Sequence, residues 1–539
     1  MRCDEARPGC KRCSTHGVAC PGYRAAVAGG IEFRDQTSIT VQRAKNQQKP
    51  KGVDDVAKNL SLVRAKPGGS YIPFLGDELL HRMTMPATIL SPTAFRSQLY
   101  SEFIDIYLPR TPPGTLDDHF SFFKRLATMP TEHPALLESL DALSLVTVGN
   151  QNKDPTLLNL SVRTYGRALN SLGKAISRCT GDDVNSDDLL ATTSVLATCA
   201  LYDEIGQHAD GWGQHVKGCQ QLIAARKPES IQSELSLLLF TNTRHSAFCF
   251  ALIERKAPLL ARPDWRAVAL KSPIQDVSIL FYDTAIQIPG MLERYDSLIS
   301  DPLLASLDSY AVLSSLDEIL HECQRLDSEL REWYSSWKLY ASLGEAGSTT
   351  TADGNLYHET SIDDFPTFTS LCIDRTFDTA FMFASFPIAY LSSIYWICLH
   401  FLRTTIQSLH TLRNVVDQTW YPEPHELVSA DELLEYVFNL CKCIPYFCEP
   451  ISSTTGQIGS FLPMRTAAIY FTSYGHWKYA KWIGAIRDSI FVKGLSPPNV
   501  KDPPDMVLRL ASVQAEDWRK AFYQCNRLHS SSVVNGSAK

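Results

Sequence analysis

The 539-residue chain lacks the short motifs that mark several large enzyme classes. It contains no G-x-S-x-G nucleophile elbow, no G-x-x-x-x-G-K-[ST] phosphate loop, no H-E-x-x-H zinc helix and no G-x-G-x-x-G turn after a strand. These absences argue against serine hydrolases, P-loop nucleotidases, zinc proteases and dinucleotide-dependent enzymes. We therefore expect a protein that is not an enzyme.

An acidic run over residues 182–188 is the remaining enzyme signal, because paired carboxylates can hold magnesium in an all-α lyase. No second acidic motif accompanies it. Its aspartates stand directly ahead of the apolar run that starts at Leu189, which is typical of a loop and the first turn of a helix. The helix interpretation is favoured.

The first thirty residues lack an apolar stretch and carry charges throughout, so no secretory signal is predicted. Eleven of the fifteen cysteines are scattered beyond Cys20, mostly in apolar stretches. Such cysteines are typical of free thiols in a reducing compartment. Cys441, Cys443 and Cys448 are a weak candidate for a metal site, because a C-x-C pair on a helix directs its sulfurs to different faces. We expect no disulfides and an intracellular protein.

Sustained heptads and alternating strand patterns are also scarce, which argues against a coiled coil and against a β-rich body. Apolar residues instead recur at helical spacing from Ser91 onward, and Ser91-Pro92 is a helix start signal. The sequence predicts an all-α body over residues 91–530, preceded by a flexible linker over 24–90 and followed by a disordered tail over 531–539. Helices are expected near 134–148, 155–178, 186–205, 212–226, 231–256, 310–340, 368–415, 429–447, 460–489 and 504–527.

One apolar stretch is long enough to cross a bilayer. The 22 residues from Phe381 to Leu402 carry no charge, although Pro387 interrupts them and several serines dilute them. A helix that is hydrophobic all round is also the expected core of a large α-domain. We favour the core helix over the membrane span.

Four cysteines are crowded into the first twenty residues. Cys3, Cys10, Cys13 and Cys20 follow the pattern C-x6-C-x2-C-x6-C. Thiolates two residues apart can share one zinc, and further cysteines can complete its tetrahedral shell. These four residues are the predicted metal ligands, and zinc is the predicted cofactor.

Basic residues accompany these cysteines. Residues 1–70 hold 13 Lys and Arg against 6 Asp and Glu, a balance of +7, whereas the remaining 469 residues have a balance of −14. A basic arm on an acidic body suits a protein whose terminus meets nucleic acid. The candidate phosphate contacts are Arg2, Arg7, Lys11 and Arg12.

The segment from Cys3 to Cys20, continued by Pro21-Gly22-Tyr23, resembles the second half of a fungal Zn2Cys6 binuclear zinc cluster. In that family six cysteines hold two zinc ions. The resemblance makes Cys3 the third ligand, Cys10 the bridging fourth, and Cys13 and Cys20 the fifth and sixth. The first C-x2-C pair, and the basic helix that family members place in the major groove, would precede Met1. Residues 1–23 are therefore interpreted as a partial cluster.

Two explanations for the missing half remain open. A reading frame begun at an internal methionine would leave about twenty residues out, judged from the ligand spacing of such modules. A genuinely short form would instead have a degenerate metal site. We favour the first, because every remaining spacing still suits zinc ligation. Four sulfurs also suffice for one closed site, although the resemblance assigns Cys3 and Cys10 to different metals.

The body resembles the fungal-specific transcription factor domain that accompanies such clusters. The resemblance rests on several short motifs, with His215 and Gly218 in the first of them. The first motif combines residues 201–204 with Trp212-x2-His215-x2-Gly218, Leu222-Ile223 and Arg226. The second combines Arg255-Lys256 with Pro263-Asp264-Trp265, and the third is Tyr395-Trp396. The fourth combines Pro463-Met464-Arg465 with Tyr470-Phe471 and Trp482-Ile483. Trp212, His215 and Gly218 also fit a close helix–helix contact, and Arg255 a helix C-terminus.

Together these patterns predict a nuclear, zinc-dependent transcriptional regulator of RNA polymerase II genes that binds specific DNA sequences. DNA binding is expected to be weak or absent in this truncated form, transcriptional co-regulators and a homodimer are left open as partners, and no membrane association is expected. The alternative is an interaction protein that keeps the regulatory body but has lost specific DNA binding. The sequence does not choose between activation and repression.

Overall fold

The computed structural model describes residues 92–110, 122–129, 131–179, 186–206, 211–270, 277–300, 309–342, 354–424, 426–491 and 494–498. The chain divides into two compact units, Met1–Leu60 and Ser61–Lys539, and all described residues belong to the second unit. These residues are mostly helical, as the sequence predicts, with one small sheet. The expected helix over 504–527 lies outside the described residues.

The first described helices pack around an antiparallel pair formed by α6 and α7. Lys153 ends α6 with a left-handed φ of 54°, and Asp154 then caps α7 by accepting hydrogen bonds from two backbone N–H groups. Pro134 and Pro155 occupy the first turns of the two helices, where their missing N–H is harmless. The bounds are α4 (Pro92–Tyr107), α5 (Phe122–Thr128), α6 (Pro134–Asn152), α7 (Pro155–Arg178), α8 (Asp187–Cys199), α9 (Asp203–Gly206) and α10 (Gly211–Ala224).

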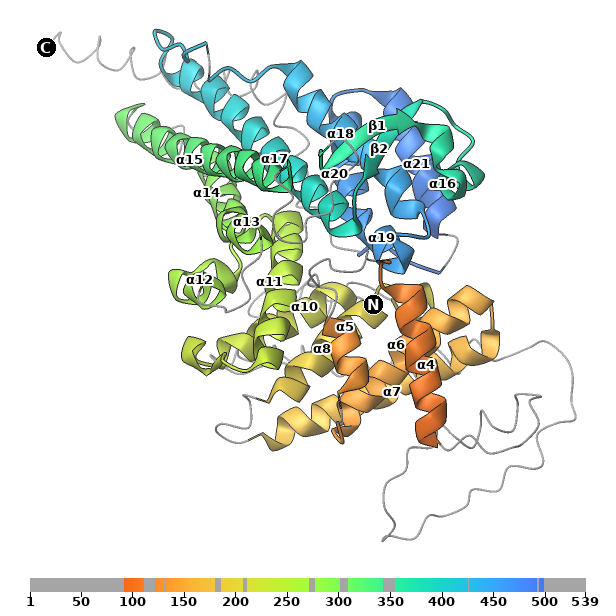
Figure 1. The fold of residues 1–539 in the computed structure, drawn as a ribbon. Helices are drawn as coiled ribbons and strands as arrows, with labels where there is room; N and C mark the ends of the chain where they lie inside the picture. The colour runs from red at the N-terminus through yellow and green to blue at the C-terminus, as the bar shows by residue number, and fades with distance from the viewer. Residues whose placement is uncertain are drawn as a thin grey trace, which may run out of the picture. The chain divides into compact units, whose positions relative to one another are not determined.

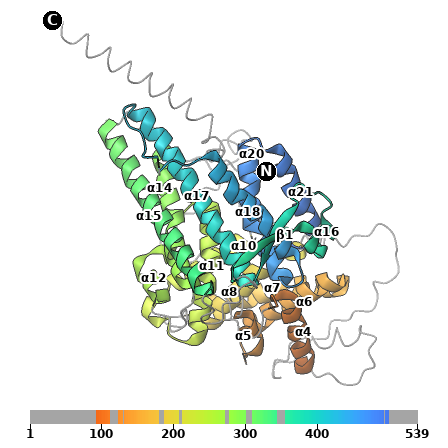
Figure 2. The ribbon, with the colours of Figure 1, turned by 45° about the horizontal axis from the view of Figure 1, so that its top comes forward.

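The middle of the chain leads into a long helix, α15, which packs beside α17 in both views (Figures 1 and 2). Three helices between 263 and 300 were not expected from the sequence. The bounds are η2 (Pro228–Ser230), α11 (Glu234–Glu254), η3 (Leu259–Ala261), α12 (Pro263–Leu270), α13 (Val277–Ala285), α14 (Ile288–Ser300) and α15 (Ser309–Ser342). The three unexpected helices are α12, α13 and α14, and two of them have nine residues or fewer.

The carboxyl-terminal part of the described chain contains the sheet. Two strands pair in antiparallel register, with Tyr357 opposite Phe383 and Ser361 opposite Thr379. The bounds are β1 (Tyr357–Ser361), η5 (Ile362–Asp364), α16 (Pro366–Leu371), β2 (Thr379–Phe383), α17 (Phe386–Val416), α18 (Ala430–Cys448), α19 (Ser453–Gly459), α20 (Phe461–Ser473) and α21 (Trp477–Phe491). The predicted helix over 460–489 is two helices, because the chain turns at Gly475 with a φ of 74°.

The apolar stretch from Phe381 to Leu402 is not one helix, which corrects the sequence interpretation. Its first three residues complete β2, and α17 begins at Phe386 with Pro387 in its first turn. A proline is compatible with the first turn but not with a helix interior, so it marks the boundary between strand and helix.

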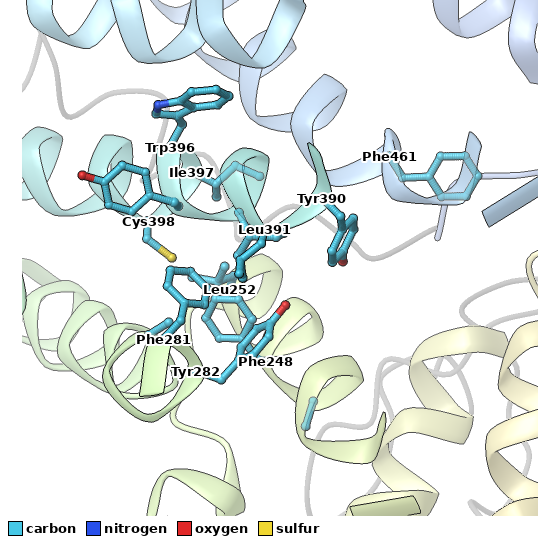
Figure 3. Packing of buried hydrophobic residues seen from close by; sticks show 14 of the residues in the cluster. Phe248, Leu252, Phe281, Tyr282, Tyr390, Leu391, Trp396, Ile397, Cys398 and Phe461 are labelled. Carbon is cyan, nitrogen blue, oxygen red and sulfur yellow. The ribbon is translucent and has the colours of Figure 1, made fainter. Parts of the chain in front are cut away.

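The expected core position of this stretch is confirmed. Figure 3 shows Leu391 and Cys398 of α17 directed toward Phe248 of α11 and Phe281 of α13, and all four side chains are buried. Burying one such apolar side chain contributes roughly 1.5–3 kcal/mol relative to leaving it exposed. Within the described part of the chain, no helix combines the length and apolarity needed to cross a membrane.

Candidate functional site

The predicted metal ligands and phosphate contacts lie outside the described residues. This applies to all eight side chains: Cys3, Cys10, Cys13, Cys20, Arg2, Arg7, Lys11 and Arg12. The metal site and the DNA contacts therefore remain predictions. Several other residues that the sequence singled out lie within the described body.

The three cysteines of α18 are packing residues. Cys441, Cys443 and Cys448 are all buried. Burial raises the pKa of Cys441 and Cys443 well above the ordinary thiol value, so both are neutral near pH 7. Across the described ranges, no group of three His, Cys, Asp or Glu side chains is placed to hold a metal ion.

The Trp212-x2-His215-x2-Gly218 motif forms a helix–helix contact, as the sequence predicts. A Cβ placed on Gly218 would lie 3.4 Å from Thr193 of α8, so glycine allows α8 and α10 to approach closely. His215 Nε2 lies 2.8 Å from the hydroxyl of Tyr165 on α7. Burial lowers the pKa of His215 to about 4, which keeps its ring neutral. The motif joins helices and does not present a ligand site.

Two arginines of the sequence motifs fasten helix ends through buried ion pairs. Arg226 donates to Asp187 Oδ1 at 2.8 Å and to the carbonyl of Ser186 at 2.6 Å, so it binds the start of α8. The predicted helix start after the acidic run is thus confirmed, although the Ser186 side chain makes no capping bond. Arg255 ends α11 with a φ of 53° and holds Asp296 of α14 with two N–H groups at 2.7 Å.

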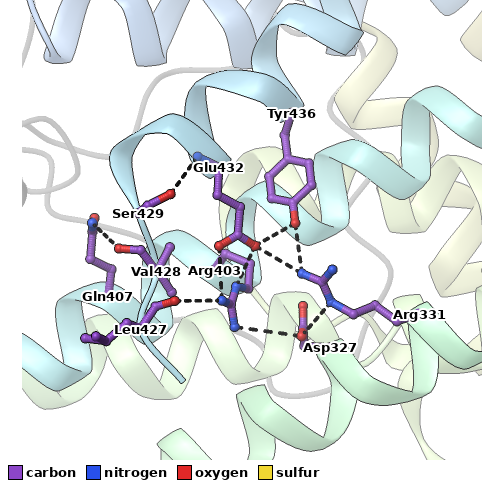
Figure 4. A network of polar contacts seen from close by, with 9 residues as sticks. All are labelled: Asp327, Arg331, Arg403, Gln407, Leu427, Val428, Ser429, Glu432 and Tyr436. Carbon is purple, nitrogen blue, oxygen red and sulfur yellow. Dashed lines mark hydrogen bonds and ion pairs between the residues drawn. The ribbon is translucent and has the colours of Figure 1, made fainter. Parts of the chain in front are cut away.

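A polar network joins α15, α17 and α18 (Figure 4). Arg403 of α17 donates to both carboxylate oxygens of Glu432, at 2.9 and 3.1 Å. Arg331 of α15 donates to Asp327 at 2.9 Å and to Glu432 at 3.2 Å, and the Tyr436 hydroxyl donates to Glu432 at 2.7 Å. Two guanidinium groups thus meet two carboxylates.

The network keeps the Glu432 carboxylate ionised. Burial raises the pKa of this group, but hydrogen bonds from Arg403 and Tyr436 and the nearby positive charges outweigh burial and lower it. Because every charge in the network has an opposite charge in contact, its role is to fix the positions of three long helices.

A second cluster of charges lies beside a small cavity between α11, α12 and α13, and Arg244 is the member of the cluster that lines the cavity. Arg266 donates to Asp283 from Nε at 3.0 Å and from a second nitrogen, whereas Arg244 reaches Asp283 only at 3.4 Å. Only 4 % of the Arg244 side chain is exposed. Two guanidinium groups therefore meet one carboxylate. This cluster was not predicted from the sequence, although Arg244 inside the apolar run 231–256 was a usable signal.

The described body is thus a mostly helical packing module whose charged groups join helices. The fold class of the described residues is all-helical apart from one two-stranded sheet. The chain belongs to the family of the fungal specific transcription factor domain, whose family model matches residues 98–371. No zinc-cluster domain is detected in the chain.

One curated relative matches part of the chain. An uncharacterized protein of Emericella nidulans is 26 % identical over 211 residues, which are 37 % of this chain and 43 % of the relative. The match thus spans less than half of the relative's length. No solved structure matches the chain.

Proposed function

We propose that this chain is a zinc-dependent, DNA-binding transcriptional regulator that acts in the nucleus. The observation that carries the proposal is a family match to the fungal specific transcription factor domain, which follows a cysteine cluster of zinc-ligand spacing in the same chain. A regulatory body and a metal-dependent DNA reader have complementary roles in transcription.

In this proposal, the four amino-terminal thiolates hold zinc, and the basic side chains between them neutralise phosphates. Four thiolates suffice for one tetrahedral zinc site, and ligation requires that they lose their protons. Cations placed between the ligands would then be fixed near the duplex and release its counterions on binding. The proposed zinc ligands are Cys3, Cys10, Cys13 and Cys20, and the proposed phosphate contacts are Arg2, Arg7, Lys11 and Arg12.

Zinc content tests the metal part of this proposal. We expect the purified full chain to contain at least one zinc per molecule by elemental analysis, and Cys13→Ser to lose that zinc. Cys179→Ser is the matched control, because Cys179 is a half-buried cysteine at the end of α7 and its substitution should leave the zinc content unchanged. A full chain without zinc contradicts the proposal.

A second candidate is a regulator that acts through protein contacts without reading DNA. It is favoured by the absence of a detected zinc-cluster domain next to a matched regulatory domain. This candidate predicts no zinc and no duplex affinity even at low salt. It also predicts a change in reporter transcription when the full chain is fused to an unrelated DNA-binding domain.

A further inference from the structure

The small cavity between α11, α12 and α13 has a polar lining on one side. Its volume is about 20 Å³, and Arg244, His245, Ser278 and Tyr282 are among its lining residues. A cavity of about 10–15 Å³ already holds one water-sized particle. The space therefore suits a ligand of one to about three heavy atoms.

The charge around this cavity is unbalanced. Asp283 is the carboxylate in contact with Arg244, and Arg266 engages both oxygens of that carboxylate. Arg244 is thus left with one long contact of 3.4 Å, and no described residue accepts a hydrogen bond from its Nε. A buried cation without a close counter-charge is unfavourable, because it has lost water and gained little in exchange.

The other deeply buried arginines have close counter-charges, although the Nε of Arg226 also lacks an acceptor among the described residues. Arg226 has Asp187 at 2.8 Å and a backbone carbonyl at 2.6 Å, and Arg255 has both oxygens of Asp296 at 2.7 Å. Burial lowers the pKa of Arg244 to about 10, and the neighbouring charge of Arg266 acts in the same direction. Among the described deeply buried arginines, the lack of a close counter-charge is therefore particular to Arg244.

We propose that this cavity is a binding site for one small monovalent anion, a halide or a short carboxylate, with Arg244 as its counter-ion. A guanidinium offers several N–H donors in one plane, and both ligand types accept hydrogen bonds from it. One negative charge restores the balance of two cations and two anions, whereas a divalent anion would exceed it. The proposal uses residues 244–283 and does not rest on the proposed zinc ligands or DNA contacts.

Thermal unfolding of the full chain tests the site. The protein is measured in sodium gluconate, whose anion is too large for the cavity, and then in sodium bromide or sodium formate at the same ionic strength. We expect a saturating rise of the unfolding midpoint by roughly 1–3 °C in at least one of the two small anions. Bromide and formate serve as separate arms for the halide and the carboxylate.

Two variants separate a bound anion from a general salt effect. In Arg244→Met the rise should disappear, because the counter-ion is lost while a side chain of similar length remains. In Arg262→Gln it should persist, because Arg262 is exposed and pairs with Asp264. The proposal is overturned if Arg244→Met responds to the anions as the wild type does, or if the wild type does not respond.

A measurement on the wild type alone covers the case in which Arg244→Met does not fold. Bromide that exchanges with a protein site shows a broadened nuclear resonance. We expect the full chain to broaden the bromide line and added formate to reverse the broadening. A line as narrow as in buffer, together with no midpoint rise in formate, overturns the proposal.

Discussion

The network between α15, α17 and α18 and the cavity between α11, α12 and α13 each bring two arginines together inside the helical body. In the network, Arg331 and Arg403 meet two carboxylates. In the cavity cluster, Arg244 and Arg266 both contact Asp283, and Glu329 acts on Arg266 only at longer range. In the first arrangement the charges balance, and the network holds helices in place. In the second, one positive charge is in excess beside a cavity of ligand size.

Charge balance, and not burial alone, therefore distinguishes a structural ion cluster from a candidate binding site. Arg403 and Arg244 both have largely buried side chains, with 12 % and 4 % exposed. Only Arg403 has two short bonds to one carboxylate. Removing or adding one charge in either cluster should therefore have unequal effects.

The largest effect is expected from unbalancing the network. Glu432→Gln leaves Arg331 and Arg403 with Asp327 as their remaining carboxylate, which reproduces the excess positive charge of the cavity. We expect the free energy of unfolding to fall by about 2–4 kcal/mol, because breaking one partner of a buried pair leaves the other uncompensated. Guanidinium denaturation measures the change.

Glu435→Gln is the matched control for this prediction. Glu435 is on the same helix and is exposed. Its substitution should change the free energy of unfolding by no more than about 0.5 kcal/mol. Equal losses in Glu432→Gln and Glu435→Gln would show that the network does not stabilise the helices.

His400 is a third position at which a buried positive charge can lack a partner, because acid protonates its ring and no described residue accepts a hydrogen bond from its Nδ1. Its ring is 7 % exposed and packs against Tyr470, and burial lowers its pKa to about 4. The unfolded chain, with a pKa near 6.5, binds the proton more readily. Stability is therefore full above about pH 6.5 and is lost as the pH falls toward 4.

The size of this loss can be measured by substitution. Between pH 7.5 and pH 5, protonation of His400 should cost roughly 2 kcal/mol of stability. His400→Leu should reduce the acid loss by about that amount, and His358→Gln, at an exposed position of β1, should leave it unchanged. An acid loss that is the same in all three proteins would contradict the assignment.

The smallest effect is expected at the unbalanced cluster itself. In gluconate, Arg244→Met should change the free energy of unfolding by less than about 1 kcal/mol, because it removes a poorly compensated charge. Arg255→Met should cost more, about 2–3 kcal/mol, because it leaves Asp296 without its two hydrogen bonds. Equal costs would remove the distinction between balanced and unbalanced arginines.

Much of the helical fold was predictable, because local signals agree with tertiary packing. The range 155–178 is the full extent of α7, set by Asp154 and Pro155 at its start. The strand β2 was missed because Phe381 to Phe383 read as the start of an apolar helix. Its partner β1 is polar and lies some twenty residues earlier, so strand pairing over that distance decided the conformation.

The sites were less predictable than the fold. Arg226 and Arg255 were noticed as motif residues, but their partners Asp187 and Asp296 follow from the three-dimensional arrangement of helices. The same is true of the Arg244 cluster, which joins residues about forty positions apart. A buried arginine can be suspected from sequence, whereas its charge balance requires the fold.

The proposed zinc-dependent DNA binding can be tested through the salt dependence of duplex binding by the full, zinc-supplied chain. If Arg2, Arg7, Lys11 and Arg12 each neutralise a phosphate, the logarithm of the binding constant should fall with the logarithm of salt concentration with a slope of roughly −3 to −4. The affinity should also be lost when zinc is chelated. Absence of duplex binding at low salt, or binding that is unchanged by chelation, would contradict the claim.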